Sequence, residues 1–173
     1  MIARVDRPGG LSRVRLLSPL RHRDFRLLWG GMCISLLGDG VFIGRNTILS
    51  CKNGDITIED GANIGFNCEV FSASRVRIGA GTLLAAYCYL IGGDHDFSDP
   101  DVAVLDQQRV SAGIDVGTGA WLGAGAKILD GVTLGNGSVV GAGAVVRHAV
   151  PDGAIAVGIP ARIVGQRQGA AHS

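Results

Sequence analysis

The stretch GGDHDFSDPD carries a histidine between two aspartates: Asp94, His95 and Asp96. Histidine accepts a proton near neutral pH, so His95 could deprotonate a hydroxyl group or an amine as it attacks a carbonyl carbon. A neighbouring carboxylate could fix the tautomer of the imidazole ring, and either aspartate is a candidate for this role. The alternative interpretation is a solvated histidine in a charged turn.

Apolar residues recur at every sixth position, and four positions after each lies a small or β-branched residue. Six residues advance a helix by roughly 600°, which would scatter these side chains over three faces, whereas on a strand they all point to one side. The period therefore predicts very short strands joined by tight bends and stacked around one buried column. The apolar positions are Val116, Leu122, Ile128, Leu134, Val140 and Val146, preceded by Ile78, Leu84 and Leu90, by Ile58, Ile64 and Val70, and by Ile43 and Leu49.

The composition agrees with a narrow repeated core. The 173 residues include 28 glycines, and 47% are apolar, but only 5% are aromatic. A layered core needs more large side chains than this, whereas a solenoid can be built from small residues at regular positions.

One long interruption separates the blocks of the repeat. The interval from Leu90 to Val116 is 26 residues, so about 20 residues must leave the coil. We therefore expect a protruding loop at about 91–113, which contains His95, and long loops on rigid repeats often carry function.

The arrangement I_GxxAx resembles the hexapeptide-repeat family, and the chain from about Val41 to Arg167 resembles its maltose/galactoside O-acetyltransferase branch. The resemblance implies an all-β fold, a left-handed parallel β-helix in which three hexapeptides form one triangular coil of about 18 residues. It implies transfer of an acetyl group from acetyl-CoA to a saccharide hydroxyl, without a metal, in a homotrimer with sites between subunits. An N-acetyltransferase acting on an amino-sugar or another small amine and an inactive β-helix paralogue are the alternatives.

The same resemblance implies roles for residues around the loop. Its first long loop carries the catalytic histidine, which makes His95 the general base. The segment NIGFNCEV implies that Asn67 contacts the acceptor, and Asp94 and Asp96 are further substrate-binding candidates. For Asn67, a corner asparagine in a left-handed turn is an equally good interpretation.

The C-terminal run from Ala120 to Val164 resembles the cofactor-binding end of the family. Trp121 matches a tryptophan near the acetyl-transfer site, and Ala124 and Ala142 match positions where the coil backbone meets the pantetheine arm. Surface packing for the tryptophan and simple repeat geometry for the alanines are the other interpretations.

The turn GIPARI, with Pro160 and Arg162, matches the turn beside the adenosine end of CoA, where a basic residue meets phosphates. Many members have asparagine where this chain has Ile159. Many members read T-K-D or similar before the V-P pair, where this chain has Arg147, His148 and Ala149, so basic character is retained. Because of these differences, the resemblance does not assign which residues contact the individual phosphates of CoA.

Residues 1–40 lack the repeat, which divides the chain into this segment, a β-helix over 41–167 and a tail over 168–173. Residues 20–40 weakly resemble the start of a major-facilitator transporter, but the uncharged run of 12 residues from Leu27 is too short to span a bilayer, which takes about 20. Three interpretations stay open: a helix that covers the first coil, a basic contact with a membrane surface, or a remnant with little function.

The net charge and the cysteines bear on whether the protein binds nucleic acid or zinc. The net charge of +1 gives no sign of a nucleic-acid partner, although residues 1–26 carry seven arginines against two aspartates. The four cysteines, without a C-x-x-C pair, argue against zinc and indicate reduced thiols in a cytoplasmic protein. Two of them are expected at small inward positions of the repeat. The cysteines are Cys33, Cys51, Cys68 and Cys88.

Two other classes of protein share such a coil. A γ-type carbonic anhydrase needs three zinc-binding histidines, but three of the four histidines here lie outside the central loop. An ice-binding module would show regular outward threonine ladders, which the sequence lacks. The histidines are His22, His95, His148 and His172.

Overall fold

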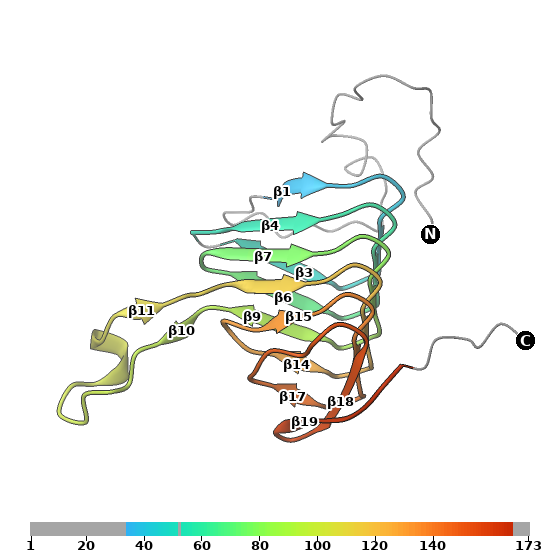
Figure 1. Cartoon of the computed structure of the whole chain (residues 1–173). Helices are drawn as coiled ribbons and strands as arrows, with labels where there is room; N and C mark the ends of the chain where they lie inside the picture. The colour runs from blue at the N-terminus through green and yellow to red at the C-terminus, as the bar shows by residue number, and fades with distance from the viewer. Residues whose placement is uncertain (1–33, 52, 168–173) are drawn as a thin grey trace, which may run out of the picture.

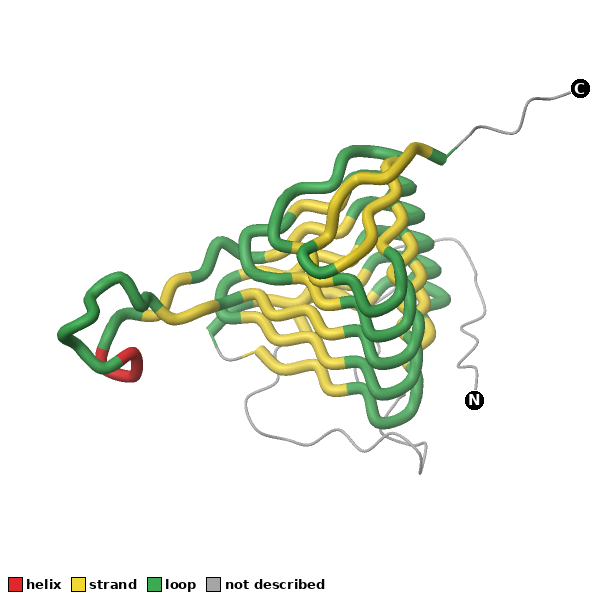
Figure 2. Tube along the Cα trace, turned by 90° about the horizontal axis from the view of Figure 1, so that it is seen from below, coloured by secondary structure: helices red, strands yellow, loops and turns green. Residues whose placement is uncertain are grey.

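The computed structural model describes residues 34–51 and 53–167, which form a left-handed β-helix with three walls (Figures 1 and 2). The walls are three sheets, A, B and C, whose strands pair in parallel from one coil to the next. Sheet A contains β1 (Ile34–Leu37), β4 (Asp55–Ile58), β7 (Arg75–Ile78), β12 (Ile114–Val116) and β15 (Thr133–Leu134). Sheet B contains β2 (Phe42–Ile43), β5 (Asn63–Ile64), β8 (Leu83–Leu84), β13 (Trp121–Leu122), β16 (Val139–Val140), β18 (Ala154–Gly158) and β19 (Ala161–Gln166). Sheet C contains β3 (Ile48–Cys51), β6 (Glu69–Ser72), β9 (Tyr89–Gly92), β14 (Lys127–Ile128) and β17 (Val145–Val146).

The chain visits the sheets in the order A, B, C in every coil, so the walls meet at three edges, which we call A–B, B–C and C–A. Val116 pairs with Leu134, 18 residues further on, as expected for three hexapeptides. Ile58 pairs with Ile78, 20 residues further on, because extra residues lie at the preceding C–A corner. The strand β19 folds back antiparallel on β18 and ends sheet B.

The predicted inward column is confirmed. From Ile58 to Val146, each of the twelve predicted apolar positions is at most 1% exposed, Leu49 is also buried, and Ile43 at the first coil is partly buried against the column. Cys68 and Cys88 occupy small inward positions, as predicted, and both are free thiols. Burial of one Leu or Ile side chain contributes about 1.5–3 kcal/mol, so the stacked coils share a continuous stabilising core.

The tight stacking of corners explains part of the glycine content. Gly119 has φ of +65°, in the left-handed region that glycine adopts without steric cost. At Gly117, an added Cβ would lie 2.6 Å from the backbone nitrogen of Asn136 in the next coil. Corners can therefore approach one another only where side chains are absent.

The predicted loop leaves the β-helix at the C–A edge and stands clear of it (Figures 1 and 2). It begins after β9 and returns at β12. Its two arms pair as the antiparallel strands β10 (Asp94–His95) and β11 (Arg109–Val110), and its tip contains the short 3-10 helix η2 (Val104–Asp106).

The N-terminal boundary of the β-helix needs a correction. Residues 1–40 were expected to lie outside the repeat, with a helix over the first coil as one interpretation, but Ile34–Leu37 form β1, which pairs in parallel with β4. Leu37, Ile43 and Leu49 are six residues apart, so the hexapeptide period extends one step further than predicted. Residues 1–33, with Cys33 and most of the transporter-like stretch, and the tail 168–173 lie outside the described residues.

Within the described part of the chain, no helix has the length and apolar character needed to cross a membrane.

Candidate functional site

Three of the residues predicted to bind the cofactor line up on the B–C edge. Ala124 follows β13 and Ala142 follows β16, 18 residues later, so both lie just beyond a strand of sheet B, and Pro160 lies at the same end of the sheet, in the turn between β18 and β19. Successive corners are joined by backbone hydrogen bonds, and the N–H of Gly143 donates to the carbonyl of Ala124 at 2.8 Å. Both alanines are exposed, so the backbone at this edge is accessible.

Asn67 lies on the same edge, two coils toward the N-terminus. Its φ is +55°, which bears out the interpretation as a corner asparagine in a left-handed turn. Its Oδ1 atom accepts a hydrogen bond from Nδ2 of Asn46 at 3.3 Å, in the coil before. A contact with the acceptor stays a prediction.

Trp121 points outward from sheet B, with 49% of its surface exposed. It is paired with Leu83 on one side and Val139 on the other. Large exposed apolar side chains therefore lie along this wall, next to the B–C edge.

The outward face of sheet A has a different character. Arg77 donates to both carboxylate oxygens of Glu59, at 2.7 and 3.1 Å, and to Asp115 at 2.8 Å. The hydrogen bonds to Glu59, and then those to Asp115, raise the pKa of the Arg77 guanidinium group above its ordinary value. On this face, the charged side chains of Arg77, Glu59 and Asp115 pair with one another. The outward face of sheet B instead exposes apolar side chains.

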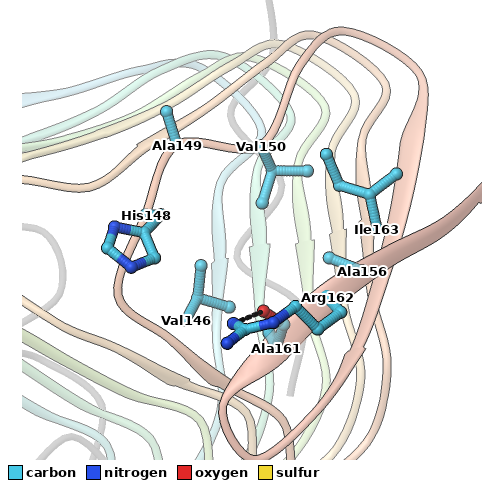
Figure 3. Close-up of a pocket in the computed structure, with 8 residues that line it drawn as sticks. All are labelled: Val146, His148, Ala149, Val150, Ala156, Ala161, Arg162 and Ile163. Atoms are coloured by element: carbon cyan, nitrogen blue, oxygen red, sulfur yellow. Dashed lines mark hydrogen bonds between the residues drawn. The ribbon is translucent and has the colours of Figure 1, made fainter.

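A pocket of about 310 Å³ lies at the C-terminal end of the β-helix, between the last coil and β19 (Figure 3). Arg162 reaches across it toward the side where His148 lies, and one guanidinium nitrogen donates to the carbonyl of Ala161 at 3.0 Å. A mostly apolar lining with a few polar groups is typical of small-molecule sites. The lining residues are Val146, His148, Ala149, Val150, Ala156, Ala161, Arg162 and Ile163.

The structure separates Arg147 from the other predicted cofactor residues. Arg147 is exposed at the C–A edge and does not line the pocket, whereas its neighbour His148 does. Sequence reasoning missed His148, because only the fold of β19 over the last coil brings it opposite Arg162. The sequence contains one indication of His148: it lies in the segment before the V-P pair, where this chain differs from many members of the family.

His95 lies in β10, opposite Arg109 of β11. The residue is half-buried, and its Nδ1 atom is fully buried without a hydrogen-bond partner among the described residues. Buried polar atoms are normally paired, so this ring has the capacity for one more bond.

Neither neighbouring carboxylate orients the imidazole ring. Asp94 accepts a hydrogen bond from the backbone N–H of His95 at 2.8 Å, and Asp96 accepts one from the backbone N–H of Ser98 at 2.9 Å. This bond from Ser98 lowers the pKa of the Asp96 carboxyl below its ordinary value. The expected role in fixing the tautomer is therefore not supported, while contact with the acceptor stays a prediction.

The predicted catalytic and cofactor residues do not converge within one chain. The loop with His95 leaves at the C–A edge, whereas Ala124, Ala142 and Pro160 lie on the B–C edge, at the other end of the sheet C strands. Among the described residues, no group of three or more His, Cys, Asp or Glu side chains could hold a metal ion.

The bacterial transferase hexapeptide (six repeats) family matches residues 113–148. The chain is 33% identical over 132 residues to the probable acetyltransferase Rv3034c of Mycobacterium tuberculosis, which covers 76% of this chain and 44% of that protein. It is 34% identical over 140 residues to Nodulation protein L of Rhizobium leguminosarum bv. viciae, which covers 78% of this chain and 71% of that protein. The chain therefore belongs to the bacterial hexapeptide-repeat transferase family.

The chain spans 44% of the length of the mycobacterial protein and 62% of Nodulation protein L from Rhizobium meliloti. The match to these relatives is therefore a match to part of each of them.

Solved structures support the fold. A mutant of AntD, an N-acyltransferase from Bacillus cereus in complex with dTDP and coenzyme A, aligns with a TM-score of 0.69 at 23% identity, over 78% of this chain and 74% of that one. A maltose O-acetyltransferase from Clostridium difficile 630 aligns with a TM-score of 0.66 at 24% identity, over 77% and 70%.

Proposed function

We propose that this protein is an acetyl-CoA-dependent O-acetyltransferase that acts on a hydroxyl group of a saccharide. Membership of the hexapeptide-repeat transferase family supports the class of reaction. The observation that carries the proposal is the pair of features that the β-helix presents: an accessible backbone edge that ends at an Arg162-lined pocket, and a protruding loop that holds a histidine.

The proposed reaction is direct transfer. His95 takes the proton of the acceptor hydroxyl as its oxygen attacks the thioester carbonyl, the C–S bond breaks, and CoA leaves as a thiolate. The acetyl group ends on the acceptor oxygen, and the thiolate recovers a proton from the imidazolium or from water. No serine or cysteine nucleophile takes part.

Acetyl-CoA would lie along the B–C edge. The exposed corners at Ala124 and Ala142 leave room for the amides of the pantetheine arm to approach the main chain. The pocket would take the adenosine end, with Arg162 and His148 beside the phosphates. This arrangement directs the thioester toward Trp121 and the N-terminal part of the edge.

A second subunit would bring His95 to the thioester. The separation of the C–A loop from the B–C edge supports a site between neighbouring subunits of a homotrimer. The apolar outward face of sheet B, with Trp121 and Leu83, supports a contact with another copy on that side. In such a contact the unpaired Nδ1 of His95 could gain its missing partner.

An amine acceptor is the second candidate, because the fold also matches AntD, an N-acyltransferase solved with coenzyme A. A half-buried histidine can take the proton of a hydroxyl as its oxygen attacks, or the proton of an ammonium before the free amine attacks, so the base does not distinguish the two.

The acceptor can be identified by measuring CoA release from acetyl-CoA with a panel of saccharides, nucleotide-sugars and amino-sugars. We expect turnover with a saccharide, and mass spectrometry should find one added acetyl group that mild alkali removes, as it does from an ester. An alkali-stable product would indicate an amide and favour the second candidate. No turnover with any acceptor would contradict the proposed function.

A further inference from the structure

Both arms of the loop are held tightly where they meet the β-helix. On the outgoing arm, a Cβ added at Gly92 would lie 2.8 Å from Cγ2 of Val76. On the return arm, Gly113 has φ of +83°, and a Cβ there would lie 2.5 Å from the carbonyl oxygen of Arg75. The hydroxyl of Ser111 donates to the carbonyl of Gly92 at 3.0 Å and joins the two arms.

Asp130 holds the return arm from the next coil. Its Oδ2 atom accepts a hydrogen bond from the backbone N–H of Ala112 at 2.7 Å, and its Oδ1 atom accepts one from the N–H of Gly113 at 2.9 Å. The backbone N–H of Gly131 also donates to the carbonyl of Gly113 at 2.8 Å. Hydrogen bonds to a carboxylate are roughly twice as strong as neutral ones, so this clamp fixes the end of the arm.

Other corner carboxylates each accept from one backbone amide. Asp152 accepts a hydrogen bond from the backbone N–H of Asn136 at 2.8 Å and one from the Asn136 side-chain amide at 3.4 Å, and Asp60 accepts one from the backbone N–H of Asp39 at 2.8 Å. Both lie on the A–B edge and join one regular corner to the next. Asp130 instead lies on the C–A edge and accepts from two consecutive amides of the loop.

We propose that Asp130 is a positioning residue, which fixes the direction of the loop and thereby the place of His95 during acetyl transfer. The inference rests on the proposed function. Ala112 and Gly113 follow β11 after one residue, Ser111, and β11 pairs with β10 through two residue pairs, one of which is His95 with Arg109. A change of angle at the base of the loop is therefore carried to the imidazole, where a misplacement of about 1 Å can lower the rate about 100-fold.

The test compares Asp130→Ala with the matched control Asp152→Ala, which also loses a carboxylate that accepts a backbone hydrogen bond. Loop order is measured as the rate of trypsin cleavage after Arg109, the single Lys or Arg between 93 and 113. We expect Asp130→Ala to be cleaved several-fold faster than the wild type, and to lose about 10- to 100-fold in kcat with KM for acetyl-CoA within about twofold. Asp152→Ala should match the wild type in cleavage rate and kcat.

Cleavage of Asp130→Ala at the wild-type rate would overturn the proposal, as would faster cleavage with unchanged kcat. An equal effect of Asp152→Ala on cleavage after Arg109 would also overturn it, because the effect would then be general loss of stability. If the wild type transfers no acetyl group at all, the proposed function fails, while the cleavage rates still decide whether Asp130 holds the loop.

Discussion

Arg162 and His148 place two basic side chains beside the apolar lining of the C-terminal pocket. We expect Arg162→Ala to raise KM for acetyl-CoA about tenfold or more, because a hydrogen bond to a charged group contributes about 1.5–3 kcal/mol. His148→Ala should act in the same direction with a smaller effect. Steady-state kinetics with acetyl-CoA and with acetyl-pantetheine, which lacks the adenosine and its phosphates, measure both.

The control for this prediction is Arg167→Ala. Arg167 is an exposed arginine that donates to the carbonyl of Gly137 and does not line the pocket. Its variant should keep the wild-type KM, and all variants should use acetyl-pantetheine as well as the wild type does. An unchanged KM for acetyl-CoA in Arg162→Ala would show that the pocket does not bind the cofactor.

Some residues of the candidate site could be predicted from the sequence, and others could not. Arg162 could be predicted from a local turn, and the repeat spacing placed Ala124 and Ala142 in equivalent positions. His148 could not be predicted in the same way, because it becomes part of a pocket only when β19 folds back over the last coil. The hydrogen bonds of Asp94 and Asp96 depend on backbone angles in the loop, which residue types alone do not define.

At the scale of the elements, the strands are stabilised by their inward side chains. Ile64 in β5 is fully buried, whereas Ile48 in β3 is 45% exposed on the outward face of sheet C. We expect Ile64→Ala to lower the free energy of unfolding by about 2–5 kcal/mol, because it leaves a cavity in the column. Ile48→Ala should cost less than about 1 kcal/mol. Urea unfolding followed by circular dichroism measures both, and equal losses would contradict the assignment of faces.

The period of six predicted most of these elements. It placed Ile58, Ile64 and Val70 on successive strands, since an even period keeps side chains on one face. It did not reveal β1, because Leu37 lies at the end of the uncharged run from Leu27, where neighbouring apolar residues conceal a single match to the period. The period also did not predict the antiparallel pairing of the two arms of the loop. This pairing depends on how the loop is held where it meets the β-helix, and not on the repeat.

At the scale of the whole molecule, the proposed site needs the loop of one subunit and the B–C edge of another. Two inactive variants should therefore complement each other: His95→Ala, which lacks the base, and Ala142→Trp, which blocks the edge. In mixed trimers of equal proportions, about a quarter of the sites combine an intact loop with an intact edge from a different subunit.

Activity of the co-expressed variants tests this arrangement, with each variant alone as the control. Recovery of about a quarter of the wild-type activity is expected. If one chain contained the complete site, every chain in the mixture would carry a defect, and no recovery would occur.

The proposed mechanism depends on His95 as the general base for acetyl transfer. The most direct measurement is kcat for acetyl transfer by the wild type and by His95→Ala, with the unfolding midpoint of each as a check of the fold. We predict a loss of about 10²- to 10⁴-fold in kcat, with KM for acetyl-CoA and the midpoint unchanged. Equal kcat in the two proteins would contradict the account.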